Sequence, residues 1–183
     1  MIMTQIYEGL LSYDWELNST PALAKAWVVS SDGKTITFTL QEGVTFHNGE
    51  AFTSADVAYS FKDLAKRFNP NGPVILKELE AVETPDPMTA LFRLANPASY
   101  LVMSRSSNDM PVICKKVFEG IEPLSNPTAN RPIGTGPLKF GAWERGQFIR
   151  LERDGNFWKR GYPLLNRIIA RFIPRSSYML GRA

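Results

Sequence analysis

The segment from Ser31 to Leu40 constrains the fold of this chain most, because its turn and strand signals agree with one another. Asp32-Gly33 supplies the residue types that a tight hairpin turn needs. Apolar and polar side chains then alternate from Thr35 to Leu40, which predicts a half-buried strand. Its apolar face consists of Ile36, Phe38 and Leu40.

A capped helix is expected to follow this strand. Asn48-Gly49 predicts a turn. Thr53, with Asp56 three residues later, resembles a capping box in which Asp replaces the usual Glu. Apolar side chains then recur at helical spacing, at Val57, Phe61, Leu64 and Phe68. This part of the chain therefore predicts strand, turn and helix in that order.

Three further segments predict β-structure. Thr89 to Leu94 repeats the alternating pattern, so we expect it to pair with Thr35 to Leu40 in one antiparallel sheet. Residues 138–143 and 148–153 flank a turn signal and predict a hairpin. Residues 168–173 predict one more strand beyond it.

Shorter segments give weaker signals. Ile2, Ile6 and Leu10 share one face of a short expected helix, and residues 111–114 form an apolar run that predicts a short strand. Gly134 and Gly136 allow a close approach of the backbone. They do not indicate a phosphate-binding loop, because no Lys-Ser/Thr pair and no strand-to-helix context follows.

Composition narrows the class of protein. The 183 residues allow one domain, or one and a half. The net charge is +3, with 21 basic and 18 acidic residues interspersed, and no basic block is present. A solvated surface of mixed charge is therefore favoured over a nucleic-acid partner, despite a pI near 9.0. No apolar run approaches the roughly 20 residues of a membrane span.

The reactive side chains do not indicate an enzyme. The one histidine, His47, lies in a predicted turn, which favours an exposed turn residue over a catalytic base. The one cysteine, Cys114, lies in an apolar run, which favours a small buried residue over a reactive thiol. We therefore expect no catalytic residues, no metal site and no cofactor.

Several motifs stand in the order and spacing of one family. In the first part they are residues 23–27, Ser31-Asp32-Gly33-Lys34-Thr35, Phe46-His47-Asn48-Gly49 and residues 53–61. In the second part they are Gly134-Thr135-Gly136-Pro137, Phe157-Trp158, Tyr162-Pro163 and Phe172-Ile173-Pro174. Together they resemble the family 5 extracellular solute-binding proteins, the peptide- and nickel-binding receptors of ABC importers. The resemblance spans Ile6 to about Pro174, with departures such as Asn48 where Asp is usual.

The resemblance implies a mixed α/β (α+β) fold. The chain is expected to be the N-terminal lobe portion of a type II periplasmic-binding-protein-like fold, with antiparallel and mixed sheets packed against helices and the C-terminal lobe absent. Residues 1–8 are then a remnant of the main N-lobe domain, residues 9–131 an extra antiparallel-sheet domain and residues 132–183 a further part of the main domain. The natural protein is expected to begin upstream, so the chain resembles a fragment.

Ligand contacts are implied on two loops. One is Asn71-Gly72-Pro73-Val74, where members of the family often carry an aromatic residue after the proline, so Val74 makes a shallower wall. The other is Ser106-Ser107-Asn108-Asp109-Met110. Asn108 suits hydrogen bonding and Asp109 a ligand ammonium, while Arg105, just before the loop, suits a ligand carboxylate. Solvated loop residues are an equally good interpretation of all five positions.

The implied function is the capture of a peptide or similar small-molecule solute and its delivery to the membrane subunits of an ABC permease. Such proteins are periplasmic or extracellular, associated with the membrane through the permease or a lipid anchor outside this chain. One lobe cannot close around a ligand, so we expect weak binding or none. The alternative is a stand-alone truncated N-lobe that acts as an interaction domain, for example a homodimer joined along residues 168–173.

Overall fold

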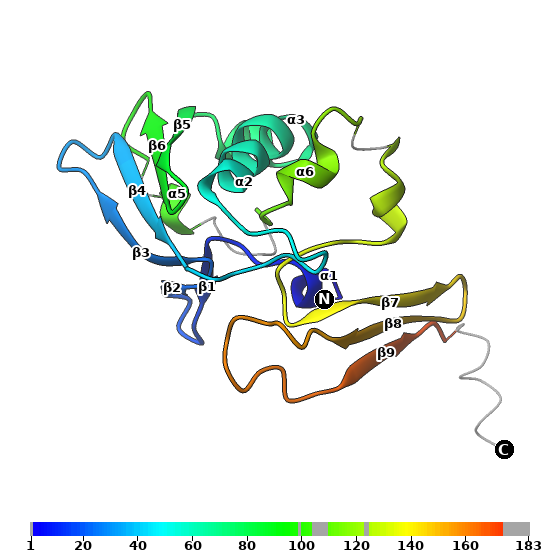
Figure 1. Cartoon of the computed structure of the whole chain (residues 1–183). Coiled ribbons are helices and arrows are strands. Elements are labelled where there is room, and N and C mark those ends of the chain that lie inside the picture. Colours follow the sequence, from blue (N-terminus) through cyan, green and yellow to red (C-terminus); the bar gives the residue numbers. More distant parts are fainter. Residues whose placement is uncertain (1, 99, 104–109, 123–124, 174–183) are drawn as a thin grey trace, which may run out of the picture.

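The computed structural model describes residues 2–98, 100–103, 110–122 and 125–173 (Figure 1). In chain order the elements are α1 (Met3–Ile6), β1 (Leu11–Tyr13), β2 (Ser19–Pro21), β3 (Ala24–Val29), β4 (Thr35–Leu40), α2 (Ser54–Ala58), the π-helix η1 (Tyr59–Ala65), α3 (Lys66–Phe68), α4 (Gly72–Ile75), β5 (Leu79–Asp86), β6 (Thr89–Leu94), α5 (Tyr100–Met103), α6 (Lys115–Phe118), the 3₁₀-helix η3 (Pro127–Asn130), β7 (Leu138–Glu144), β8 (Phe148–Arg153) and β9 (Arg167–Arg171). The mixed α/β class is as predicted.

The larger sheet has the strand order β3-β4-β6-β5, and every pair in it is antiparallel. The predicted pairing of the two alternating segments is confirmed, with Ile36 opposite Phe92 and Phe38 opposite Ala90. Gly33 has a φ of 67°, as the turn before β4 requires. The inward side chains of β4 and β6 are buried, which confirms the predicted apolar face.

The predicted helix covers this buried face as the continuous run α2-η1-α3, which Figure 1 shows beside the sheet, to the right of β4 and β6. The capping box is confirmed, because the Thr53 N–H donates to Asp56 Oδ2 at 2.9 Å. Phe61 meets Phe92 edge to face at 5.2 Å between ring centroids. The π-helical turns of η1 rotate the residues that follow them relative to an ideal α-helix. Phe68, at the end of the run, is therefore turned away from the core and is 36% exposed.

A smaller sheet has the order β7-β8-β9, again antiparallel, and confirms the predicted hairpin and third strand. One of its faces packs with α1 in a second core cluster that contains Ile6, Tyr7, Leu138 and Leu151. The first cluster is built from residues between positions 10 and 114. The predicted division into residues 1–8, 9–131 and 132–183 stays a prediction.

Two short elements were predicted wrongly. The first helix ends at Ile6, because Tyr7 is extended (φ −109°, ψ 146°) and leads the chain into β1. Leu10 is fully buried, but in the core of the larger region. Residues 111–114 form no strand, because their N–H groups bond elsewhere: Val112 donates to the Glu8 carbonyl and Ile113 to Ser60 Oγ.

The segment from Gly134 to Gly136 lies against the end of α1, which confirms the predicted close approach. The Gly136 N–H donates to the Ile6 carbonyl at 2.8 Å. A Cβ at Gly134 would lie 2.0 Å from the Ile6 carbonyl oxygen, and one at Gly136 would lie 2.4 Å from that of Gln5. Only glycine fits at these two positions without movement of the backbone.

Gly134→Ala should therefore destabilise the protein by about 1–3 kcal/mol, the usual cost of inserting a methyl group into a packed site, because backbone atoms must move. Gly155→Ala is the matched control, since an added Cβ there meets nothing within 4 Å. Urea unfolding of both variants measures the difference. Equal free energies of unfolding for both variants would contradict the close approach.

Candidate functional site

The predicted ligand-binding residues fall into three groups. Val74 lies on α4 and is 75% exposed. Met110 is 1% exposed and belongs to the larger core cluster. Arg105, Asn108 and Asp109 lie outside the described residues. Their role in binding stays a prediction.

The structure brings the ends of the two predicted loops together. Asn69, just before the loop that carries Val74, contacts Met110 with 3.9 Å between Nδ2 and Sδ. The Asn69 side chain also accepts a hydrogen bond from the Asn71 N–H at 2.9 Å. Because Met110 is packed in the core, it anchors the end of its loop next to the start of the other loop.

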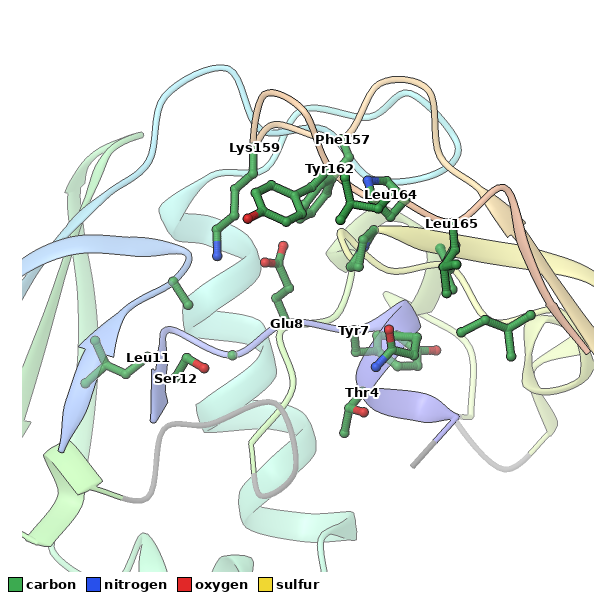
Figure 2. A pocket seen from close by; sticks show the side chains of 17 residues that line it. Thr4, Tyr7, Glu8, Leu11, Ser12, Phe157, Lys159, Tyr162, Leu164 and Leu165 are labelled. Carbon is green, nitrogen blue, oxygen red and sulfur yellow. The ribbon is translucent and has the colours of Figure 1, made fainter. Parts of the chain in front are cut away.

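A separate cavity of about 600 Å³ lies between the N-terminal segment and the loop from residue 157 to residue 168 (Figure 2). Its buried lining includes Tyr7, Leu11 and Leu138. Its rim includes Tyr162 and Leu164, which are 58% and 81% exposed. The cavity therefore has an apolar lining and an exposed apolar rim.

Two oppositely charged side chains line the same cavity. Figure 2 shows Glu8 pointing toward the loop of Lys159, and the Lys159 side chain pointing back toward the N-terminal segment. The Trp158 indole N–H donates to Glu8 Oε2 at 2.9 Å. Lys159 Nζ lies 4.8 Å from the centre of the Trp158 ring, in a cation–π arrangement.

Burial governs the acid–base state of this site. It raises the pKa of Glu8, against the opposing effects of the Trp158 hydrogen bond and the Lys159 charge. Burial also raises the pKa of Tyr7 to about 12, so the phenol is a neutral group at physiological pH. The cavity therefore offers a ligand an ammonium, aromatic surface and the Glu8 carboxyl, whose charged form a cationic ligand would favour.

This cavity could not be predicted from the sequence. Glu8 and Trp158 are 150 positions apart, and no local pattern joins them. The available signals were a glutamate among apolar residues near the N-terminus and the run Tyr162-Pro163-Leu164-Leu165, whose apolar side chains have no alternating or helical spacing. Neither signal predicts the cavity by itself, because the cavity forms only where these distant segments meet.

His47 proves to be half-buried, so the expectation of an exposed turn residue is wrong. Its Nε2 lies 2.9 Å from the Gly136 carbonyl oxygen, which only accepts, and the Gly134 N–H lies 3.3 Å from Nδ1. The ring therefore carries its proton on Nε2 and accepts at Nδ1. Burial lowers the pKa of His47, against the opposing effect of the Gly136 carbonyl. Both ring nitrogens are used to hold the glycine segment.

The remaining reactive groups of the described residues are Cys114 and the acidic side chains. Cys114 is buried, as predicted, and burial raises the pKa of its thiol, which disfavours the nucleophilic thiolate. Among the described residues, no three His, Cys, Asp or Glu side chains gather where they could hold a metal ion. In the same part of the chain no helix has both the length and the apolar character to span a membrane.

The chain was compared with protein families of known function. The model of the bacterial extracellular solute-binding proteins, family 5 (middle), matches residues 18–182. The chain belongs to this family. Family 5 proteins are the periplasmic or extracellular solute-binding proteins of ABC importers, and the curated relatives are binding proteins rather than enzymes.

Individual relatives support the same assignment. The chain is 30% identical to a glutathione-binding protein, GsiB of Pectobacterium atrosepticum, over 93% of this chain and 33% of the relative. NikA from Brucella suis, solved with Fe(III)-EDTA, has a TM-score of 0.85 at 26% identity, over 97% of this chain and 35% of that chain. AppA of Bacillus subtilis is an oligopeptide-binding protein solved with a nonapeptide. It has a TM-score of 0.84 at 26% identity, over 97% of this chain and 36% of that chain. The chain thus spans about a third of the length of its relatives.

The His47 contacts predict a pH-dependent stability. The pKa of His47 is lower in the folded state than in the unfolded state. As the pH falls below the ordinary His pKa of about 6.5, the unfolded chain is therefore protonated at His47 before the folded chain is, and the folded state loses stability. His47→Gln removes this titration. We expect the stability advantage of the wild type over His47→Gln to shrink between about pH 8 and about pH 5. Thermal unfolding across this range measures it, and an advantage that grows on acidification would contradict the assigned tautomer.

Proposed function

We propose that this chain supplies part of the solute-binding surface of an ABC importer's binding protein, which captures a peptide or similar small-molecule solute and delivers it to the membrane permease. The observation that carries this proposal is the family match over residues 18–182. Relatives that bind glutathione or a nonapeptide support a peptide-like solute.

The solute contacts are assigned to the two loops that meet at Asn69 and Met110. Asp109 pairs with a ligand ammonium, Arg105 with a ligand carboxylate, and Asn108 hydrogen-bonds the ligand backbone. Val74 offers an exposed wall on the other loop. The contact between Asn69 and Met110 supports this assignment, because it holds the start of one loop next to the end of the other.

Capture is proposed to depend on closure of two lobes around the solute. The loops belong to an extra domain formed by residues 9–131, and residues 1–8 with residues 132–183 contribute to the main domain of the N-lobe. Closure excludes water and so strengthens the few polar contacts inside. A chain that spans about a third of its relatives offers one side of such a cleft, so it binds weakly by itself.

The competing function is a stand-alone interaction domain that dimerises along β9. The observation in its favour is the exposed edge strand with Ile169 and Phe172, which are 45% and 48% exposed. An antiparallel pairing of two copies centred on Ile169 would place Arg167 opposite Arg171 twice. Like charges directly opposite each other are destabilising, and charged edges resist pairing. A dimeric mass in solution would nevertheless support this second function.

Titration of the chain with glutathione and with a Met-Leu dipeptide tests the solute-binding proposal. We expect dissociation constants in the high micromolar to millimolar range, on the order of 4–5 kcal/mol of binding free energy. Val74→Trp should tighten binding several-fold, because a Trp at this exposed position deepens the wall. Val28→Trp is the control, since Val28 is 68% exposed on the distant strand β3.

Isothermal titration calorimetry of the three proteins gives the result. Nanomolar affinity for the wild type would contradict the need for closure. Equal effects of Val74→Trp and Val28→Trp, or no heat at millimolar solute, would contradict the assignment of the solute to these loops.

A further inference from the structure

We propose that the cavity between the N-terminal segment and residues 157–168 is a second binding site, which takes a small zwitterion such as a free amino acid with an apolar side chain. Glu8 binds the ammonium group and Lys159 binds the carboxylate. Neither Val74 nor Met110 lines this cavity, so the site is separate from the described part of the two loops.

Glu8 is the first argument. A carboxylate held away from water is costly unless an opposite charge and hydrogen bonds compensate it. The Trp158 indole is a neutral donor and supplies one hydrogen bond, at 2.9 Å. The ion pairs within 4.0 Å in the described part of the chain do not include Glu8. A ligand ammonium would supply the missing charge through a charge-assisted hydrogen bond.

Lys159 is the second argument. It is exposed at the cavity and also takes part in none of those ion pairs. Its charge opposes the rise that burial causes in the pKa of Glu8, so the two groups interact across the cavity without a direct contact. The cation–π contact with Trp158, 4.8 Å from Nζ to the ring centre, holds the ammonium in place. Two opposite charges held apart in this way match the two charges of one amino acid.

The apolar lining is the third argument. The cavity is lined by the buried side chains of Tyr7, Leu11 and Leu138. Its rim is apolar and exposed, and includes Tyr162 and Leu164. Exposed apolar groups gathered at a hollow are typical of binding sites. The volume of about 600 Å³ is that of a small-ligand pocket and holds an apolar side chain beside the charged groups.

Three probes test the contributions of the ligand's ammonium and carboxylate groups one at a time. L-Leucine carries both, N-acetyl-L-leucine lacks the ammonium, and L-leucinamide lacks the carboxylate. Binding to the wild type is followed by ligand-detected NMR, and the dissociation constants are obtained by titration. We expect leucine to bind about tenfold more tightly than either analogue, the usual loss for one charged hydrogen bond.

Two variants assign each charge to its residue. Glu8→Gln keeps an oxygen for the Trp158 N–H and should weaken leucine and leucinamide about tenfold, with little effect on N-acetyl-leucine. Lys159→Met should weaken leucine and N-acetyl-leucine, with little effect on leucinamide. Glu80→Gln and Lys34→Met are matched controls at exposed positions outside the cavity. Thermal unfolding confirms that each variant is folded.

The outcomes decide between the two sites. Equal affinities for the three probes, no binding of leucine at millimolar concentration, or an unchanged affinity in folded Glu8→Gln would each overturn the proposal. Val74→Trp should leave leucine binding unchanged, while it alters binding of the dipeptide to the loops. Failure of the loop site and failure of this cavity are therefore distinguished by separate measurements.

Discussion

The contact between the Gly134–Gly136 segment and the end of α1 is the constraint on which the rest of the structure depends. The Ile6 carbonyl accepts the Gly136 N–H at 2.8 Å, with no room for a side chain on either glycine. This contact fixes the point where the chain leaves α1 for the larger region and returns to begin β7. His47 secures the same segment from the larger region.

A series of buried polar contacts connects this junction to the helix of the larger region. Asp56 caps the helix and also accepts the Lys115 N–H at 2.8 Å. Ser60, one turn later, accepts the Ile113 N–H at 2.8 Å, and the neighbouring Val112 N–H donates to the Glu8 carbonyl at 2.9 Å. Glu8 is thus held by its backbone on one side and by Trp158 on the other, which reduces the entropy lost when it binds a ligand.

The elements that could be predicted from the sequence depend on short-range signals. The strand Thr35–Leu40, the capping box at Thr53 and the β7-β8 hairpin each follow from residues within one turn or one strand. The coil at residues 111–114 could not be predicted, because its N–H groups donate to the Glu8 carbonyl and to Ser60 Oγ. The end of α1 could not be predicted either, because the Ile6 carbonyl accepts the N–H of the distant Gly136. His47 was misjudged for the same reason, since its partner Gly136 is 89 positions away.

The residues of the candidate sites also differ in whether local sequence or long-range packing determines them. The family motifs around Gly134 and Trp158 lie apart in the sequence, yet both meet the N-terminal segment: Gly134 packs against Ile6, and Trp158 donates to Glu8. Val74 is 75% exposed, so substitution there costs little stability. Met110, by contrast, is buried and sets where its loop ends. In the proposed loop site, position 74 is therefore free to change, while the junction at Gly134 and Gly136 is fixed by close packing.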